Sequence, residues 1–304
     1  MIYTLTFSPS IDYVVYLDNE FESGRINRVR HDDIYYGGKG VNVSQVLLGL
    51  GIENTALGFV AGFTGREIDD GLKRMGINTD FVHLRSGRSR INIKLKSDVE
   101  SEINAASPRI DASDINALYE KIERIGPKDM LVLAGNVPEN IDRNLPAMII
   151  ERLSDNSTKV IVDTQGESLF NILPYRPFLI KPNHVELSEL FNEEFSPSDT
   201  FRIEEAARRL QINGARNVLV SLASEGAILV TEDGKVYHRQ APGGYVKNSV
   251  GAGDSMVAGF IAGYIENHDL EDAFIMGIAA GSATAFSEGL ASGSEIRDLY
   301  RLMR

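Results

Sequence analysis

The chain has 304 residues, of which 43% are hydrophobic, so it is long enough to bury a large core as one large domain or two small ones. Its formal net charge of -12 argues against a nucleic-acid partner, because binding to phosphate backbones needs clustered lysine and arginine. It contains no cysteine, which excludes disulfides and thiolate metal sites and favours a reducing compartment such as the cytoplasm.

Short apolar, β-branched runs alternate with helical patterns along most of the chain. The runs that predict strands span residues 2–7, 56–61, 130–135, 159–163, 178–181, 217–222 and 227–231. The helical patterns span residues 41–51, 65–75, 112–125, 140–153, 202–213, 254–266, 270–286 and 293–303. Several strands are apolar throughout, as expected for strands covered on both faces. This alternation predicts an α/β fold with a mainly parallel sheet, whose ligands bind at the carboxyl ends of the strands.

Two segments, residues 12–36 and 88–104, interrupt this order with alternating patterns that carry many charges and lack helical spacing. We expect them to form antiparallel strands outside the main sheet. Because a small sheet leaves one face uncovered, these strands are predicted to cover a site or to pair with a second subunit. No long linker divides the chain, so we expect residues 1–304 to be one domain with these two lid segments inserted.

The first residues, MIYTLTFSPSID, form an alternating, strand-like pattern without the basic and apolar regions of a signal peptide. No apolar run approaches the roughly 18 residues that a membrane-spanning helix needs. We therefore expect a soluble, cytoplasmic protein that binds neither nucleic acid nor a membrane.

The stretch YYGGKGVNVSQVLLGLG (35–51) places three glycines and a lysine ahead of an apolar-faced helix. Gly37, Gly38 and Gly40 would let a ligand approach the backbone. Lys39 adds positive charge, and Asn42 falls in the first helical turn. Neither the P-loop pattern GxxxxGK[ST] nor the dinucleotide pattern GxGxxG occurs in the chain. A glycine-rich turn with a solvated lysine is the alternative interpretation.

In LIKPNHVELSEL (179–190), Pro182 ends a strand, and Asn183 and Glu186 share one face of the helix that begins there. A carboxamide and a carboxylate placed in this way can hold a hydrated Mg²⁺, which prefers oxygen ligands and keeps several waters. The same spacing fits a capping box, in which the Glu side chain returns to the backbone of the Asn cap. Taken alone, the spacing favours the capping box.

Three features give weaker signals. Ser221 and Gly226 in SLASEGA (221–227) fall at a strand end and a tight turn, where a β-turn is the default interpretation. Asp12 follows the first strand, and its carboxylate would either bind sugar hydroxyls or stabilise a turn. Cations in the lid segments suit a phosphate-bearing substrate, although edge-strand charges are often solvated. These cations are Arg25, Arg28, Arg88, Arg90 and Lys94.

The stretch NSVGAGDSMVAGF (248–260) places three small residues and a carboxylate where an apolar helix begins. The backbone N–H groups at a helix start are unpaired and carry the positive end of the helix dipole, which suits an anion. The N–H groups of residues 251–253 beside Asp254 meet the needs of phosphoryl transfer, which are donors for the transferring group and a base for the attacking hydroxyl. A capped glycine turn is the alternative.

Together these motifs resemble those of the ribokinase-like sugar kinases of the PfkB family, and the resemblance runs along the whole chain. GGKGVNV and NSVGAGDSMVAGF are similar to the two family signatures, and KPNHVE is similar to the Asn-x-x-Glu motif linked to Mg²⁺. SLASEGA is similar to the S-L-G-x-x-G turn, with Ala223 in place of a glycine. The resemblance implies a three-layer α/β/α sandwich with a mainly parallel sheet, a small β-sheet lid and a homodimer formed through the lid.

Within the family, RINIKLKSDVESEIN, FLIKPNHVELSELF and AAGSATAFSEGLA resemble most the branch that phosphorylates fructose 1-phosphate. This implies transfer from ATP, with Mg²⁺, to the C6 hydroxyl, giving fructose 1,6-bisphosphate. Tagatose-6-phosphate kinases and 6-phosphofructokinases of the same family are the alternatives. Two departures concern the expected sugar-phosphate pocket. EINAASP (102–108) lacks two glycines of the pattern E-I-N-G-x-G-P, and Asn136 stands where the pattern S-G-S-x-P has its second serine.

The resemblance also implies roles for individual residues. Asp254 is the expected catalytic base, and the backbone of Gly251, Ala252 and Gly253 is the expected anion hole. The expected substrate-binding residues are Asp12, Gly37, Gly38, Lys39, Asn42, Arg25, Arg28, Arg90 and Asn136. The expected ATP-binding residues are Lys181, Asn183, Ser221, Glu225, Gly226, Ser249, Gly251 and Gly253. Asn183 and Glu186 are expected to hold Mg²⁺ through water.

Two other functional classes are compatible with an α/β fold. A sugar-phosphate sensor without turnover is disfavoured by the intact Asp254 and GAG turn, and an ATP-consumption assay would distinguish it. A nucleotide-cofactor oxidoreductase is disfavoured by the lack of GxGxxG, and an NAD(H) titration would exclude it. The lid cations disfavour an unphosphorylated sugar or a nucleoside as the substrate.

Overall fold

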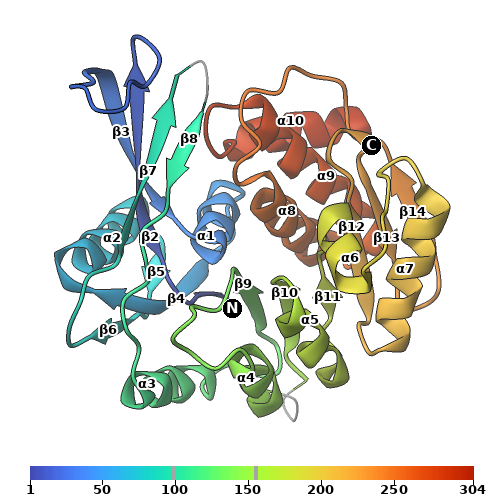
Figure 1. The fold of residues 1–304 in the computed structure, drawn as a ribbon. Coiled ribbons are helices and arrows are strands. Elements are labelled where there is room, and N and C mark those ends of the chain that lie inside the picture. Colours follow the sequence, from blue (N-terminus) through green and yellow to red (C-terminus); the bar gives the residue numbers. More distant parts are fainter. Residues whose placement is uncertain (98–99, 154–156) are drawn as a thin grey trace.

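A computed structural model describes residues 1–97, 100–153 and 157–304. Figure 1 shows a large sheet between two layers of helices, with a small second sheet projecting beside the first helix. The predicted three-layer α/β/α architecture with a β lid is therefore confirmed.

The large sheet has the strand order β14-β13-β12-β11-β10-β9-β1-β4-β5, with β6 paired to β4. Its strands are β1 (Ile2–Thr6), β4 (Asn54–Ala61), β5 (Asn78–Thr79), β6 (Val82–Leu84), β9 (Met130–Ala134), β10 (Lys159–Asp163), β11 (Leu179–Ile180), β12 (Asn217–Ser221), β13 (Ala227–Val230) and β14 (Val236–Arg239). Among the described strands of this sheet, only β12–β13 and β13–β14 pair antiparallel. All seven predicted strands are present. The additional strands β5, β6 and β14 are short, so they carry little periodic signal.

Helices cover both faces of this sheet (Figure 1). One layer contains α1 (Lys39–Gly49), α2 (Gly62–Met75), α8 (Ala252–Asn267), α9 (Leu270–Phe286) and α10 (Gly293–Met303). The other contains α3 (Ala112–Ile122), α4 (Leu145–Leu153), α5 (Glu167–Ile172), α6 (His184–Phe191) and α7 (Thr200–Ile212). Successive strand residues alternate between the two apolar layers, since Leu131 and Leu133 face the second layer while Met130 and Val132 face the first. This explains why the strands are apolar throughout.

All eight predicted helices are present, and α4 differs most from its predicted bounds. It begins at Leu145 rather than at residue 140. The Asp142 carboxylate accepts the backbone N–H of Asn144 at 2.9 Å, and such a local bond holds the preceding residues in a turn.

The lid sheet has the order β3-β2-β7-β8 and consists of β2 (Ser10–Leu17), β3 (Val29–Gly37), β7 (Arg90–Lys96) and β8 (Ser101–Ile103). Residues 98–99 of the predicted lid segment 88–104 lie outside the described residues. The expectation of antiparallel pairing is wrong for one pair, because β2 and β7 run parallel. Both strands continue from parallel strands of the main sheet, β1 and β6, and therefore leave it in the same direction.

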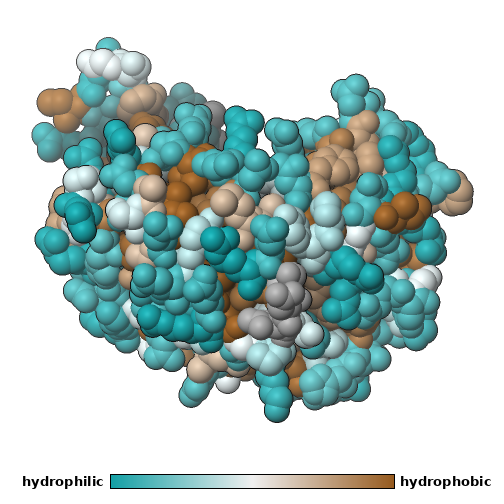
Figure 2. Space-filling model, turned by 90° about the horizontal axis from the view of Figure 1, so that it is seen from below, coloured by the Kyte–Doolittle hydropathy of each residue, from teal (hydrophilic) through white to brown (hydrophobic). Residues whose placement is uncertain are grey.

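Figure 2 shows the molecule from below, where most residues are hydrophilic and hydrophobic ones form small separate areas. In the described parts of the chain, no helix is both long enough and apolar enough to pass through a lipid bilayer.

Candidate active site

The carboxyl ends of β1, β9, β10 and β12 open into a cavity of about 1780 Å³, which the lid and the start of α8 also line. Pockets for one small ligand are typically about 300–1,000 Å³. The cavity is therefore large enough for two ligands side by side.

Most of the predicted site residues line this cavity. They are Asp12, Gly38, Lys39, Asn42, Arg90, Asn136, Lys181, Asn183, Glu186, Ser221, Gly226, Ser249, Gly251, Ala252, Gly253 and Asp254. Four predicted residues do not line it: Gly37, Glu225, Arg25 and Arg28. The Arg25 side chain is 75% exposed in the β2–β3 turn and pairs with Glu22 at 3.0 Å. Gly37 lies behind Asp12, and a Cβ at Gly37 would stand 2.5 Å from the Asp12 carboxylate, so glycine is required there for steric reasons.

Asp254 lies in the first turn of α8 and is only 6% exposed. Its Oδ2 accepts a hydrogen bond of 2.7 Å from Asn42 Nδ2. Burial, followed by repulsion from Asp163, raises the pKa of Asp254 to about 7, against the opposing effects of Asn42, Lys39 and Lys181. A carboxylate with a pKa near neutral pH is suited to accept a proton from a substrate.

The helix start beside Asp254 offers free backbone donors. Gly251 caps α8 with φ of 81°, a left-handed conformation that glycine adopts readily. The Ala252 N–H donates to the Ser249 carbonyl at 3.2 Å. Among the described residues, the N–H groups of Gly251 and Gly253 meet no acceptor. Two of the three predicted anion-hole donors are therefore available to a ligand.

Two lysines that line the cavity meet one carboxylate oxygen. Lys39 Nζ and Lys181 Nζ each lie 3.3 Å from Asp163 Oδ1, at the end of β10. Burial would lower the pKa of Lys39, but attraction to Asp163, Asp254 and Glu186 outweighs it and raises that pKa. Lys181 also lies against α8, because a Cβ at Gly253 would stand 3.3 Å from its Nζ. Both cations are therefore held beside Asp254 and the helix start.

Asn183 and Glu186 form the capping box that their spacing favours. Asn183 Oδ1 accepts the N–H of Glu186 at 2.8 Å, and Glu186 Oε2 accepts the N–H of Asn183 at 2.8 Å. Gln165 Nε2 donates to Glu186 Oε1 at 2.5 Å. Each oxygen of Glu186 keeps a further lone pair, since an ionised carboxylate has about four acceptor sites. The cap therefore does not use up the oxygen atoms that a cation would need.

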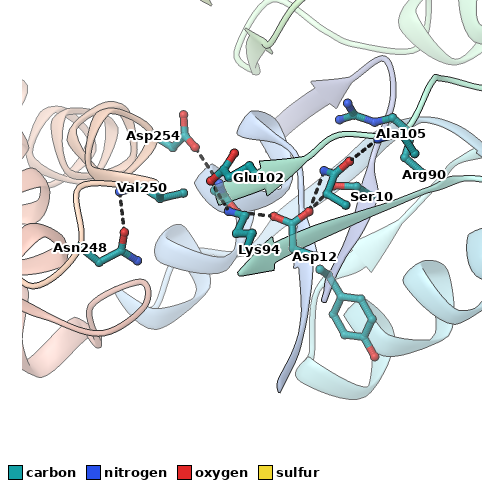
Figure 3. Close-up of polar contacts among 12 residues, drawn as sticks. Ser10, Asp12, Arg90, Lys94, Glu102, Ala105, Asn248, Val250 and Asp254 are labelled. Carbon is teal, nitrogen blue, oxygen red and sulfur yellow. Dashed lines mark hydrogen bonds and ion pairs between the residues drawn. The ribbon is translucent and has the colours of Figure 1, made fainter. Parts of the chain in front are cut away.

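The lid side of the cavity is built around Asp12 (Figure 3). Its Oδ1 accepts hydrogen bonds from Ser10 Oγ at 2.8 Å and Asn92 Nδ2 at 2.9 Å, and its Oδ2 lies 3.4 Å from Lys94 Nζ. In the view of Figure 3, Asp254 lies on one side and the lid groups lie on the other. A carboxylate on the main body thus stands apart from a mixed polar and cationic group on the lid.

Arg90 is a half-buried cation on the lid side. Its Nη2 donates to the Ser8 carbonyl at 3.0 Å, whereas its buried Nε has no partner. Burial lowers the pKa of Arg90 despite the nearby charge of Asp12. Among the described residues, most buried side-chain atoms without a partner belong to residues that line the cavity; these residues are Thr6, Ser8, Arg90, Asp163 and His184. Buried polar groups are normally paired, so this concentration indicates a polar ligand.

Residues 5–297 match the sequence profile of the pfkB family carbohydrate kinases. The chain belongs to this family. It is 41% identical to the 1-phosphofructokinase of Bacillus subtilis (strain 168), over 98% of this chain and 97% of that protein. It is 36% identical to the D-tagatose-1-phosphate kinase of Bacillus licheniformis, over 97% of this chain and 96% of that protein.

This carbohydrate kinase is also similar to solved structures. One is phosphofructokinase-2 from Escherichia coli in complex with fructose-6-phosphate, with a TM-score of 0.91 and 28% identity over 99% of this chain and 98% of that one. These relatives support a sugar-phosphate kinase activity, and the family implies ATP as co-substrate.

The structure adds site residues of this kinase that the sequence patterns did not reveal. Asp163 is the last residue of the predicted strand KVIVD, a position at which ligand-binding residues of parallel sheets gather. That position was the available signal. Asn92 and Gln165 had no such signal, because their roles depend on contacts with distant segments.

The wall of the cavity also has contributors beyond SLASEGA. Residues 241–244 and the α9 residues Ile278, Ala285 and Phe286 line it. The Phe286 ring lies against the backbone of Gly244, where a Cβ would stand 2.3 Å from it. Apolar helix residues of this kind cannot be told from ordinary core residues in the sequence.

Proposed function

We propose that this kinase transfers the γ-phosphoryl group of ATP to the C6 hydroxyl of D-fructose 1-phosphate, giving fructose 1,6-bisphosphate. The observation that carries the proposal is the arrangement of a buried Asp254 at a helix start, apart from a lid side that holds the half-buried cation Arg90. The 41% identity to a 1-phosphofructokinase over nearly the full chain supports this choice of substrate.

Asp254 is the proposed catalytic base. It would accept the proton of the C6 hydroxyl as that oxygen attacks the γ-phosphorus and the bond to the β-phosphate oxygen breaks. Its raised pKa near 7 makes it a better proton acceptor than an ordinary carboxylate, and Asn42 holds its orientation through the 2.7 Å hydrogen bond.

The charge that develops on the transferring group would be met by the helix start and by two lysines. The N–H groups of Gly251 and Gly253 are the proposed anion-hole donors, while the N–H of Ala252 is engaged with Ser249 in this structure. Lys181 and Lys39 stand beside these donors, fixed by Asp163. In this position Lys39 would bind the transferring phosphoryl group and not only the sugar.

The acidic residues at the nucleotide side fit a bound Mg²⁺. Asp163 Oδ2 is buried without a partner, and Glu186 keeps free lone pairs beside Asn183. Glu186 and Asn183 would hold the ion through water, with Asp163 facing it. When bound, Mg²⁺ neutralises charge on the nucleotide phosphates. Ser221, Gly226 and Ser249 are proposed to line the nucleotide.

The lid side would bind the sugar phosphate. Asp12, with Gly38 and Asn42, is proposed to bind sugar hydroxyls, and Arg90 is proposed to bind the phosphate that the substrate already carries. Asn136 lines the same cavity. Roles for Arg25, Arg28 and Glu225 remain predictions, because these residues lie outside the cavity of a single chain.

A second candidate substrate is tagatose 1-phosphate, because a D-tagatose-1-phosphate kinase is 36% identical to this chain. Tagatose 6-phosphate and fructose 6-phosphate also stay open as substrates. Fructose 1-phosphate and tagatose 1-phosphate carry the phosphate at C1, whereas tagatose 6-phosphate and fructose 6-phosphate carry it at C6. The place of the phosphate is therefore the main question for the lid side.

We also propose a cytoplasmic homodimer that pairs through the outer face of the lid. Across the four strands, Ile34, Tyr13, Ile93 and Ile103 lie side by side in register, on the face opposite Asp12. Ile34 is 59% exposed and Ile103 is 58% exposed. An apolar row across an otherwise charged sheet suits the same row of a second copy, since a two-fold interface is self-complementary.

Coupled ADP release with Mg-ATP tests the proposed function against fructose 1-phosphate, tagatose 1-phosphate, tagatose 6-phosphate, fructose 6-phosphate and free fructose. We expect the highest kcat/KM for fructose 1-phosphate, by about tenfold, a difference that one lost contact of about 1.4 kcal/mol would produce. A preference for another sugar phosphate would change the proposed substrate but not the proposed mechanism. No turnover with any of them would support a sensor.

A further inference from the structure

Asn92 joins the polar contacts around Asp12 to a further segment of the chain, and the proposed function gives it no role. Asn92 is 6% exposed and lies directly beside Asp12 in the parallel register of β2 and β7. Both ends of its amide are engaged. Its Nδ2 donates to Asp12 Oδ1 at 2.9 Å, and its Oδ1 accepts the backbone N–H of Ala105 at 3.2 Å.

The alternation of side chains along a strand explains why these groups meet. Arg90, Asn92 and Lys94 in β7 share one face, as do Ser10 and Asp12 in the adjacent β2. The isoleucines between them lie on the outer face. Asn92 is therefore the central member of this polar face, it lines the cavity, and it is hydrogen-bonded to Ala105 in the segment that follows β8.

Asp12 has little freedom to turn. Its Oδ1 accepts two hydrogen bonds, its Oδ2 lies 3.4 Å from Lys94 Nζ, and the backbone of Gly37 closes the space behind it. A carboxylate that is held on both oxygens also fixes the orientation of the Asn92 amide. The hydrogen bond from the Ala105 N–H to that amide then fixes the position of the segment around Ala105.

The segment that Asn92 holds, residues 104–108, crosses the sugar end of the cavity, and residues 104–107 line it. It is the stretch in which the chain lacks two glycines of the family pattern. None of its residues has a positive φ, so its backbone does not need glycine at these positions. Its position over the cavity depends instead on contacts such as the one to Asn92.

We propose that Asn92 is a positioning residue that joins the Asp12 carboxylate and loop 104–108 into one unit, and that this unit selects the substrate by the place of its phosphate. The inference rests on the proposed function, because it takes this end of the cavity to bind a ketose phosphate. A loop fixed relative to Asp12 fixes the positions of both groups around the sugar. In a ketofuranose, C1 is attached to the anomeric carbon, which carries a hydroxyl, whereas C6 is attached to C5, which carries a hydrogen, so the 1-phosphate and the 6-phosphate present different groups to this unit.

Two substitutions test the two hydrogen bonds of the Asn92 amide separately; the bond to Asp12 is called the Asp12 arm and the bond from Ala105 the Ala105 arm. Asn92→Asp keeps the oxygen that accepts the Ala105 N–H but places a second carboxylate oxygen against Asp12, which breaks the first arm. Ala105→Pro removes the N–H and leaves the Asp12 arm intact. Asn92→Ala removes both arms without adding charge, and it serves if either of the others fails to fold. Lys96→Ala is the matched control in the same strand, because Lys96 pairs with Glu100 at 2.6 Å and does not line the cavity.

The readout is the ratio of kcat/KM for fructose 1-phosphate to kcat/KM for fructose 6-phosphate. This ratio does not depend on the fraction of active enzyme, so a merely destabilised protein keeps it. We expect each arm variant to lower the ratio about tenfold, and the double variant to lower it by less than the product of the two, because both act on one unit. The KM for ATP should stay within about twofold of wild type, and Lys96→Ala should keep the wild-type ratio.

Two results would overturn the proposal. If the Asn92 variants lower kcat/KM for both sugar phosphates equally, Asn92 does not select between them. If Ala105→Pro keeps the wild-type ratio while Asn92→Asp loses it, Asn92 acts without the loop. Failure of the proposed function is distinguishable, since it appears as a wild-type preference for another sugar phosphate. The same ratio, taken between that preferred substrate and the one phosphorylated at the other end, then tests Asn92.

Discussion

Asn42 Nδ2 donates a hydrogen bond of 2.7 Å to Asp254 Oδ2, and this bond joins the start of α1 to the start of α8. A donor to a carboxylate favours its charged form and so lowers its pKa. In this site that effect opposes burial and the charge of Asp163, and the pKa of Asp254 is about 7 as a result. Asn42 therefore both orients the proposed base and limits how far its pKa rises.

The pH dependence of the enzyme should report this balance. We expect kcat/KM for the sugar phosphate to fall as the pH drops below about 7, because Asp254 must be ionised to accept a proton. Asn42→Ala removes the donor, so the pKa of Asp254 should rise and the acid limb should move to higher pH. Initial rates at saturating Mg-ATP over a range of pH measure the acid limb of wild type and that of Asn42→Ala. An unchanged limb in Asn42→Ala, or a wild-type profile that is flat around neutral pH, would contradict this account.

Asp254→Asn keeps the shape of the side chain and removes the proposed base. We expect kcat to fall by about 10²–10⁴, the usual contribution of a general base. The KM values should change little, because the amide keeps its place in the cavity. Steady-state kinetics measure this change. Wild-type turnover in this variant would remove Asp254 from the mechanism.

The same variant should be more stable than wild type at alkaline pH. A carboxyl group with a folded-state pKa of about 7 and an ordinary value of 3.8 binds more protons in the folded state between these limits. Folding stability therefore falls as pH rises through this window, by up to about 1.4 kcal/mol per pH unit. Asp254→Asn removes that dependence. Thermal unfolding at pH 5 and pH 8 should show a higher Tm for the variant mainly at pH 8; equal Tm differences at the two pH values would show that Asp254 is not perturbed.

Much of the fold could be predicted because its signals are local. Apolar strands such as KVIVD and glycine-rich helix starts such as GAGD keep their character whatever lies around them. The direction of β7 relative to β2 could not be predicted in the same way, because it is set by β6, a three-residue strand with almost no pattern of its own.

The candidate site residues also divide into those with a local signal in the sequence and those without one. Asp254 and Asn183 were found through motifs at helix starts, where one short stretch contains the whole signal. Asp163 and Asn92 act through partners more than 75 residues away in the chain, such as Lys39 and Asp12. Such contacts exist only after the strands assemble, so no window of the sequence shows the partners, although the end of the strand KVIVD marks the position of Asp163.

Arg90→Ala should weaken binding of the sugar phosphate more than it slows the chemical step. One charge-assisted contact contributes roughly 1.5–3 kcal/mol, so the KM for fructose 1-phosphate should rise by about one to two decades. Arg88→Ala is the control, because Arg88 is an exposed arginine of the same lid segment that does not line the main cavity. Kinetics with varied sugar phosphate measure the change. An unchanged KM in Arg90→Ala would place the substrate phosphate elsewhere.

The apolar row on the outer face of the lid predicts the oligomeric state. The double variant Ile34→Glu with Ile103→Glu puts two charges into that row, and charges buried at an interface are strongly unfavourable unless paired. We expect wild type to sediment as a dimer and the double variant as a monomer at micromolar concentration. Phe201→Glu, at an apolar residue that is 69% exposed on α7, is the control and should stay dimeric. A wild-type monomer, or a double variant that still dimerises, would exclude this interface.

Ala223 occupies the turn position where the family pattern has glycine, and its φ of 51° lies in the left-handed region. That conformation is unfavourable for a residue with a Cβ by about 1–2 kcal/mol. Ala223→Gly relieves it but adds freedom to the unfolded chain, which offsets about 0.4–1 kcal/mol. We therefore expect a net stabilisation of about 0.5–1 kcal/mol in urea unfolding. The control is Ala112→Gly, an exposed position without a positive φ at the start of α3, which should destabilise by a similar amount. If both variants are destabilised equally, the turn at Ala223 is not strained.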